Sequence, residues 1–236
     1  MLLLRAVAEA SDDDSTAARL AEACGLNRAT AWRLLNTLEA HGMVSCDRES
    51  GRWSIGVSVV NLARSTGLET VIGTARPVLE RLSRRTGETA ALAVARLDGL
   101  TYVDEVVPPA IVAATWLGRT VPLHATSTGK VLLTFGDDDR LVQRLVERGL
   151  RRFTTTTHTE GGALTSELQR VRRRGYATCS GEYEASAWGV SAPVLDQAGR
   201  LLAVLSIWGP GTRVTTALFD VLGPVVAEAA STLWSG

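Results

Sequence analysis

One stretch of this sequence, GLNRATAWRLLNTLEAHGMV from Gly25 to Val44, combines side chains that recognise nucleic acids with the spacing of a helix. Arginine can hydrogen-bond guanine or a phosphate, and asparagine can pair with adenine. The polar side chains fall on a helix face that the apolar ones do not occupy. The candidate DNA-contacting residues are Asn27, Arg28, Ala29, Thr30, Trp32, Arg33 and Asn36. An ordinary solvated helix face is the alternative.

A second stretch, PLHATSTGKVLL at residues 122–133, contains the only lysine of the chain, Lys130. A Gly-Lys pair suggests a P-loop, but that motif needs a glycine where His124 stands and a serine or threonine where Val131 stands. Nucleotide binding is therefore excluded. Residues Ala125 to Gly129 instead predict a loop at the start of a helix, whose free N–H groups and dipole favour an anion. A helix cap without a ligand is the alternative.

Enzymatic motifs such as GxSxG, HExxH and the dinucleotide-binding glycine motif are missing from the sequence. Glu182 and Glu184 are two residues apart, which on a strand puts them on one face, and a carboxylate pair can do acid–base work. Exposed acidic side chains are the commoner explanation. The histidines and cysteines, which share no ligand spacing, are His41, His124, His158, Cys24, Cys46 and Cys179. We therefore expect no metal site, no cofactor and no enzymatic activity.

The length of 236 residues is typical of one or two domains. The formal net charge is zero, which argues against a broadly basic nucleic-acid-binding protein, so any positive charge for phosphates must be local. No segment approaches the roughly 20 apolar residues that cross a membrane. The start, MLLLRAVAEA, is interrupted by Arg5 and predicts a helix and not a signal peptide. We expect a cytoplasmic protein that does not bind a membrane.

The elements that would position the first stretch follow a helix-turn-helix pattern. Ser15 is a candidate N-cap for the second helix, Gly25 a left-handed turn residue and Asn27 the cap of the third helix. The apolar spacing i, i+3, i+4, i+7 predicts a buried stripe of Ala31, Leu34, Leu35 and Leu38. We expect helices at residues 2–10, 16–24 and 28–41.

A polar DRESG turn between two short strands, residues 44–46 and 52–55, predicts a β-hairpin, the wing of a winged helix-turn-helix. Arg52 in this wing is a candidate for a minor-groove or phosphate contact, and a plain surface arginine is the alternative. Trp32 has a single donor, so we expect it to contact a thymine methyl group or a sugar. Alternatively, Trp32 fills a gap beside the wing.

The rest of the chain mixes helices with antiparallel strands, which is typical of an α+β domain. Pro77 predicts a break near residues 75–76 between helical segments, and Asp98-Gly99 predicts the turn of a hairpin. We expect helices at 57–67, 68–86, 126–135, 137–149, 163–174 and 213–234. We expect strands from Gly87 to the Asp98-Gly99 turn, from that turn to 108, and at 110–116, 176–179, 188–196 and 200–209.

The order of these elements and four motifs resemble the IclR family of bacterial transcription regulators. The motifs are LAEACGLNRATAWRLLNTLEAHGMV with SGRWSIG, PLHATSTGKVLL, RRRGYATCSGEYEASAWGVSAPVLD and LSIWGP. The resemblance covers nearly the whole chain. It implies a winged helix-turn-helix DNA-binding domain at residues 1–56, a linker helix at 57–70 and a GAF-like effector-binding domain at 71–236. It also implies dimers, often paired into tetramers.

The resemblance implies a polar effector cup in members that sense small keto acids. Carried over by motif, its Asp position is Cys179, its Cys position is Gly189, and its two Ser positions are Ser206 and Trp208. The implied effector-binding residues are Ala110, Ala113, His124, Ser127, Thr128, Gly129, Cys179, Glu182, Gly189, Ser206 and Trp208. Because polar groups are lost, we expect a larger, partly aromatic effector that stacks on Trp208, with its polar end held by residues 127–130. Alternatively, Trp208 fills the pocket and no ligand binds.

The predicted function is a ligand-responsive regulator, more likely a repressor than an activator, that binds a palindromic double-stranded DNA operator as a homodimer or tetramer. The alternative is a metabolite-binding module or an enzyme whose N-terminal domain serves only for dimerisation. The chain has more apolar residues in two segments than one small domain can bury, and these residues predict the dimer contact. They are Leu2, Leu3, Leu4, Val57, Val59, Val60 and Leu62.

Overall fold

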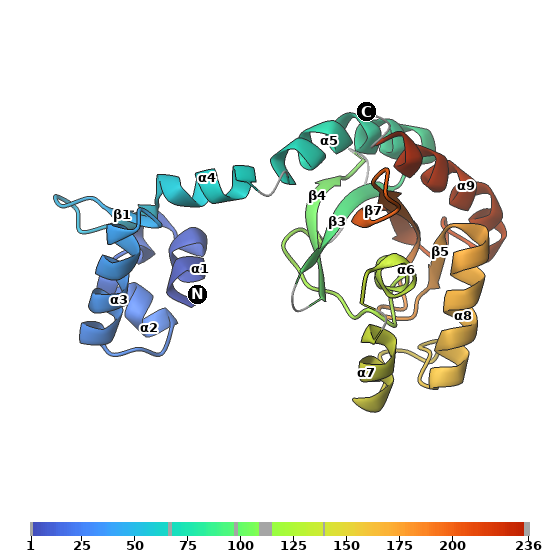
Figure 1. The fold of residues 1–236 in the computed structure, drawn as a ribbon, viewed down its shortest axis with the longest axis horizontal. Coiled ribbons are helices and arrows are strands. Elements are labelled where there is room, and N and C mark those ends of the chain that lie inside the picture. The colour runs from blue at the N-terminus through green and yellow to red at the C-terminus, as the bar shows by residue number, and fades with distance from the viewer. Residues whose placement is uncertain (1, 66–67, 97–98, 109–114, 139, 234–236) are drawn as a thin grey trace. The chain divides into compact units, whose positions relative to one another are not determined.

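The computed structural model of the chain describes residues 2–65, 68–96, 99–108, 115–138 and 140–233 (Figure 1). It divides into two compact units, Met1–Thr70 and Val71–Gly236. Each unit has its own hydrophobic core. Within the described residues, no helix is both long and apolar enough to span a bilayer.

The N-terminal unit is a helix-turn-helix followed by a small hairpin, as predicted. Strand β1 pairs antiparallel with β2, with Val44 opposite Ile55. The core of the unit contains Leu3, Val7, Leu20, Ala21, Ala31, Leu35, Val44 and Trp53. The elements are α1 (Leu2–Glu9), a 3-10 turn (Asp12–Asp14), α2 (Ala17–Ala23), α3 (Arg28–Ala40), β1 (Val44–Cys46), β2 (Trp53–Ile55) and α4 (Val57–Ser65).

The turn between α2 and α3 has the predicted chemistry. Gly25 adopts a positive φ of 64°, which favours glycine. The side chain of Asn27 caps α3 by accepting a hydrogen bond from the backbone N–H of Thr30 at 2.8 Å. The predicted cap at Ser15 is wrong, because Thr16 precedes α2 and makes no side-chain cap bond. The carbonyl of Ser15 instead accepts from the N–H of Trp53 at 2.9 Å, which joins this segment to the wing.

The buried stripe of α3 is narrower than predicted. Ala31 and Leu35 are fully buried and Leu38 is half-buried, but the side chain of Leu34 is 43% exposed. Residue 34 is three positions after residue 31, so it lies to one side of the line through residues 31, 35 and 38. The core beneath α3 is small, and it buries only the side chains along that line. Leu34 therefore does not belong to the core.

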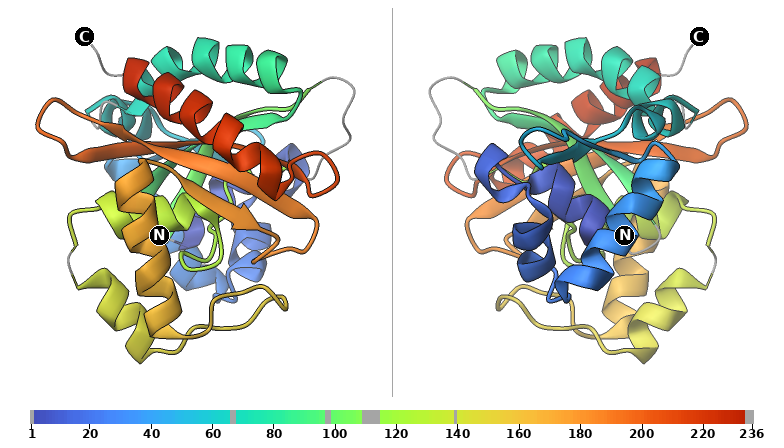
Figure 2. Two further views of the ribbon diagram at one scale, coloured as in Figure 1. Left: turned by 90° about the vertical axis from the view of Figure 1, so that its right-hand side faces the viewer. Right: turned by 90° about the vertical axis from the view of Figure 1, so that its left-hand side faces the viewer.

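The C-terminal unit is built on a five-stranded antiparallel sheet with the order β4-β3-β7-β6-β5. Helices α5 and α9 lie on one face of this sheet, and α6 lies on the other (Figure 2). The strands are β3 (Thr89–Arg96), β4 (Gly99–Val106), β5 (Ala177–Ser180), β6 (Ala187–Leu195) and β7 (Leu201–Pro210). The helices are α5 (Leu68–Thr86), α6 (Ser127–Phe135), α7 (Leu141–Glu147), α8 (Gly161–Arg174) and α9 (Thr216–Thr232).

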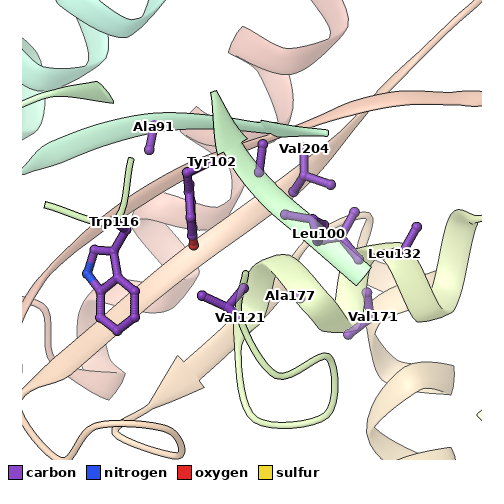
Figure 3. Close-up of a cluster of buried hydrophobic side chains, with 11 residues drawn as sticks. Ala91, Leu100, Tyr102, Trp116, Val121, Leu132, Val171, Ala177 and Val204 are labelled. Carbon is purple, nitrogen blue, oxygen red and sulfur yellow. The ribbon is translucent and has the colours of Figure 1, made fainter. Parts of the chain in front are cut away.

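A cluster of buried apolar side chains fills the space between the sheet and α6 (Figure 3). Tyr102, Trp116 and Val121 lie at one end of the cluster, and Leu132 and Val171 lie at the other. Alternation along the strands, as in Ala91 and Ala93 of β3, directs these side chains to one face. Tyr102, Trp116 and Val121 also border the cavity described below.

Two expectations for this unit need correction. Helix α5 continues through Pro77 without the predicted break, since Ala75, Val78 and Leu79 keep its inner face buried on both sides of the proline. Helix α7 begins at Leu141 and not at residue 137. The predicted strand at 110–116 falls mostly outside the described residues.

Candidate functional site

The outer face of α3 presents two arginines without acidic partners. The side chains of Arg28 and Arg33 are exposed, and neither forms an ion pair with any residue that the structure describes. Ala29 beside them is also exposed, and Thr30 is half-buried. A free guanidinium on an exposed helix can pair with a phosphate or with the edge of a guanine. This face has the charge and the donors that DNA requires.

The structure shows Trp32 packed beside the wing, as one of the two interpretations predicts. Its ring centroid lies 5.9 Å from that of Trp53 in the wing, at an interplanar angle of 86°, which is an edge-to-face contact. The side chain is nevertheless 49% exposed. One part of the indole therefore packs on the wing, while the other part can contact a ligand in front of α3.

The remaining predicted contacts on the N-terminal unit have intramolecular partners. The amide of Asn36 donates to the carbonyl of Trp32 at 2.8 Å. Arg52 forms an ion pair with Asp13, with 2.9 Å between the guanidinium and a carboxylate oxygen. Both ionic side chains are largely exposed, so the pair is weak and a phosphate can replace the carboxylate. Contacts from Asn36 and Arg52 to DNA would require these bonds to open.

The cavity of the C-terminal unit lies beside a row of residues across three strands. Cys179 of β5 is opposite Gly189 of β6, and Gly189 is opposite Trp208 of β7. A Cβ at Gly189 would lie 2.7 Å from the carbonyl oxygen of Ile207 and 3.0 Å from the Cβ of Trp208, so only glycine fits there. Three residues predicted from two separate motifs therefore meet at one site.

The cavity has a volume of about 40 Å³ and an aromatic wall. Trp116 contacts Trp208 at a centroid distance of 6.1 Å and 90°, and it contacts Tyr183 at 5.5 Å and 54°. The lining contains no charged side chain among the described residues. It consists of Tyr102, Trp116, Val121, Thr126, Ser127, Cys179, Tyr183, Ala187, Trp188, Gly189 and Trp208.

The start of α6 closes one side of the cavity. The hydroxyl of Thr126 caps this helix by accepting from the N–H of Gly129 at 3.0 Å. A Cβ at Gly129 would lie 2.3 Å from the carbonyl oxygen of Leu123, so the helix can begin here only with glycine. The N–H groups of Ser127 and Thr128 lie in the first turn, where no partner exists within the helix. Ser127 lines the cavity, whereas Thr128 and Gly129 lie behind it.

A chain of buried hydroxyl groups joins α6 to the sheet. Ser191 donates to Ser127 at 2.8 Å and lies 3.3 Å from the hydroxyl of Thr128, which is 2.7 Å from that of Tyr102. Burial raises the pKa of Tyr102 to about 12, so its phenol stays protonated. This network holds the helix start against β4 and β6, where a ligand would touch it.

Lys130 and Glu182 form a buried ion pair that the sequence did not reveal. The ammonium group lies 2.6 Å from a carboxylate oxygen of Glu182 and 3.0 Å from the carbonyl of Thr178, and both charged side chains are at most 7% exposed. The interpretation of Glu182 as an exposed acid is wrong, and it does not share a strand with Glu184. Because its ammonium group is buried and bonded to Glu182 and Thr178, Lys130 does not hold the polar end of a ligand in this conformation.

Two further predicted effector residues, His124 and Ser206, are absent from the lining that the described residues form. His124 is buried and bonded through Nε2 to the carbonyl of Arg151 at 2.9 Å. Ser206 donates to the carbonyl of Ala91 at 3.3 Å. Ala110 and Ala113 lie outside the described residues.

The aromatic lining residues Tyr102, Trp116, Tyr183 and Trp188 were missed by the analysis of the sequence. They come from a strand, two connecting segments and a second strand, so no spacing relates them. The one available signal was the pair of aromatic residues in the polar segment GEYEASAW. Among the described residues, no group of three or more histidine, cysteine or acidic side chains could hold a metal ion.

A winged helix-turn-helix together with a separate domain that holds a cavity is typical of ligand-responsive DNA-binding regulators. The model of the IclR helix-turn-helix domain matches residues 1–48, and that of the bacterial transcriptional regulator IclR C-terminal domain matches residues 64–234. The chain belongs to the IclR family of transcriptional regulators. It is a regulator and not an enzyme, which confirms the predicted class.

Similarity to individual proteins extends over both units. The chain is 31% identical over 224 residues to the HTH-type transcriptional repressor AllR of Salmonella typhi, covering 94% of this chain and 82% of the relative. A regulator from Alicyclobacillus acidocaldarius has a TM-score of 0.77 and 28% identity, over 100% of this chain and 97% of that one. The inducer-binding domain of an Acinetobacter PobR double mutant, in complex with 3-hydroxybenzoic acid, has a TM-score of 0.61 and 29% identity, over 67% of this chain and 94% of that one.

Proposed function

We propose that this regulator is a repressor whose DNA affinity changes when a small aromatic molecule enters the cavity beside Trp208. Residues 1–56 bind a palindromic operator, the linker at residues 57–70 includes α4, and residues 71–236 bind the effector. The observation that carries the proposal is the aromatic, uncharged wall of the cavity, formed by rings such as Trp116, Tyr183 and Trp208. Such a wall favours an aromatic ring over a small keto acid, which needs polar groups.

Contacts to DNA come from α3 and the wing. Arg28 and Arg33 pair with phosphates or guanine edges, and Trp32 contacts a thymine methyl group or a sugar. In a helix-turn-helix the second helix lies in the major groove with its N-terminal half toward the bases. The supporting residues are Asn27, Ala29, Thr30, Asn36 and Arg52.

Two relatives support the assignment as a repressor and the aromatic class of the ligand. AllR is named a repressor, and the PobR domain was crystallised with 3-hydroxybenzoic acid. The effector contacts of this chain are assigned to Ser127, Cys179, Gly189 and Trp208, with Thr128 and Gly129 behind them. His124, Glu182 and Ser206 stabilise the surroundings of the cavity and do not touch the ligand.

A homodimer, or a tetramer of two dimers, matches the symmetry of a palindromic operator. The apolar residues Leu2, Val57, Val60 and Leu62 are 44–71% exposed, which exceeds what a small monomeric domain needs. Leu3 was expected in this contact but is buried in the core of its own unit, and Leu4 and Val59 are half-buried. The dimer contact is therefore assigned to the exposed residues of α1 and α4.

A gel-shift experiment with DNA from upstream of its own gene tests the proposal. The full-length protein should retard one fragment, and 3-hydroxybenzoate should change the amount retarded. Sedimentation should give at least a dimer at micromolar concentration. A protein that retards no fragment at low salt, or that sediments as a monomer, would contradict the proposed mode of DNA binding.

A further inference from the structure

One residue of the cavity lining carries a hydrogen-bond donor that no described residue uses. The indole Nε1 of Trp208 is buried and has no hydrogen-bond partner within the described part of the chain. Buried donors are nearly always paired, because leaving one unpaired is unfavourable. An indole N–H can only donate, so the missing partner is an acceptor.

A second tryptophan in the same lining provides a direct contrast. Trp188 also borders the cavity, but its Nε1 donates to the carbonyl of Ala185 at 3.0 Å. Its donor is therefore occupied by the protein itself. Both indoles are half-buried, and they differ in whether the N–H has a protein partner.

Several other polar groups near the lining already have protein partners. The only lysine of the chain is bound to Glu182 and Thr178 and contributes no charge to the lining. The hydroxyl and thiol groups that have protein partners are those of Tyr102 with Thr128, Ser127 with Ser191, and Cys179 with the carbonyl of Ala125. The indole N–H of Trp208, by contrast, is a buried donor with no partner among the described residues.

We infer that Trp208 recognises the effector through this N–H, which donates to a carbonyl or carboxylate oxygen attached to the aromatic ring. The assignment rests on the proposed function, because it places an aromatic effector in this cavity. The volume of about 40 Å³ is smaller than a benzene ring needs, so the edge-to-face pair of Trp116 and Trp208 must open. That opening gives the ligand access to Nε1.

The uncharged lining affects which acceptor group on the ligand binds more tightly. A carboxylate in this site finds no charged side chain among the described lining residues. An amide oxygen accepts the same hydrogen bond without the cost of removing a charge from water. An aromatic amide should therefore bind at least as tightly as the matching carboxylate.

The test compares three probes on the full-length wild type, Trp208→Phe and Trp188→Phe by calorimetry. Benzoate and benzamide carry an acceptor oxygen, whereas toluene has the ring alone. Trp208→Phe keeps a ring but removes the donor, so it should bind benzoate and benzamide roughly tenfold more weakly, as expected for one lost hydrogen bond. The affinity of Trp208→Phe for toluene should change less than about twofold, because toluene accepts no hydrogen bond from the indole. Trp188→Phe should keep the wild-type preference among the three probes, because the N–H of Trp188 is bonded to the protein and not to the ligand.

Each other outcome overturns the inference in a distinct way. Unchanged benzamide affinity in Trp208→Phe would leave the aromatic effector in place and remove the donor role. Equal losses for all three probes would assign Trp208 to ring packing alone. No binding of any probe by the wild type would reject the aromatic effector itself, and the donor role with it. A nitrogen-15 spectrum provides a second readout: benzamide should shift the indole N–H signal of Trp208 and not that of Trp188.

Discussion

At the scale of single residues, the arginines of the N-terminal unit differ in whether they have an acidic partner. Arg28 and Arg33 on α3 have no acidic partner among the described residues, whereas Arg52 is bound to Asp13 and Arg48 to Glu39. The formal net charge of the chain is zero, so local pairing decides where DNA can be attracted. The free arginines mark the face of α3 that is available to DNA.

Replacing Arg28 or Arg33 by alanine should weaken operator binding while leaving the fold intact. Each contact to a base edge contributes roughly 1–3 kcal/mol, and neither side chain is part of the core. Fluorescence anisotropy with labelled operator DNA measures the loss, and the melting temperature should stay within a few degrees. Arg81→Ala, an exposed substitution on α5, is the matched control. Wild-type affinity in both α3 variants would remove this helix from the interface.

Asp13→Asn should strengthen binding to nonspecific DNA at low salt. The carboxylate of Asp13 lies 2.9 Å from the guanidinium of Arg52 and competes with phosphate for it. Exposed pairs contribute about 1 kcal/mol or less, so a gain of a few fold is expected. The gain should disappear when Arg52→Ala is present as well. A gain that persists in the double variant would show that Arg52 is not the group released.

At the scale of elements, α3 is attached to its unit by a narrow stripe. Leu35→Ala should lower the free energy of unfolding by about 2–5 kcal/mol, as truncation of a fully buried leucine does. Leu34→Ala should cost far less, since its side chain is 43% exposed. Urea unfolding of the two variants makes the comparison. Equal losses would mean that Leu34 is buried in the protein in solution.

Helix α6 is attached to β5 and the following turn by the pair of Lys130 and Glu182. Lys130→Met should lower the free energy of unfolding by about 3–5 kcal/mol, because it leaves a buried carboxylate unpaired. Adding Glu182→Leu should recover most of the loss, since two apolar side chains then replace the pair. Thermal unfolding of both variants checks this. No recovery in the double variant would mean that the pair does not act as one unit.

Local features of the fold were predictable, and long-range ones were not. The cap at Asn27, the turn at Gly25 and the wing strand at 44–46 depend on neighbouring residues and were found from the sequence. Leu34 was misplaced because a helical repeat does not show how wide the core beneath it is. Lys130 and Glu182 are 52 residues apart, and no sequence pattern relates them.

The cavity residues also divide into those that the sequence predicts and those that it does not. Cys179, Gly189 and Trp208 were predicted through motif resemblance, and strand register brings them into one row. Trp116 and Tyr183 come from connecting segments, whose path depends on the packing of the whole unit.

At the scale of the whole molecule, the two units must be coupled if the protein responds to a ligand. An effector changes DNA affinity only if it binds the DNA-competent and DNA-incompetent states with different affinity. The cavity borders the start of α6, whose hydroxyl network reaches β4 and β6. An aromatic effector that separates Trp116 from Trp208 would disturb this hydrogen-bond network. The DNA-competent and DNA-incompetent states can then differ in how the network is arranged.

The most direct test of the account is operator affinity with and without an aromatic effector, measured by fluorescence anisotropy on the full-length protein. With 3-hydroxybenzoate or benzamide present, the wild type should bind operator at least fivefold more weakly, a coupling of about 1 kcal/mol or more. The variant Trp208→Phe, which lacks the donor assigned to the ligand, should show a smaller shift at the same benzamide concentration. Binding of the ligand to the wild type without any change in operator affinity would contradict the account.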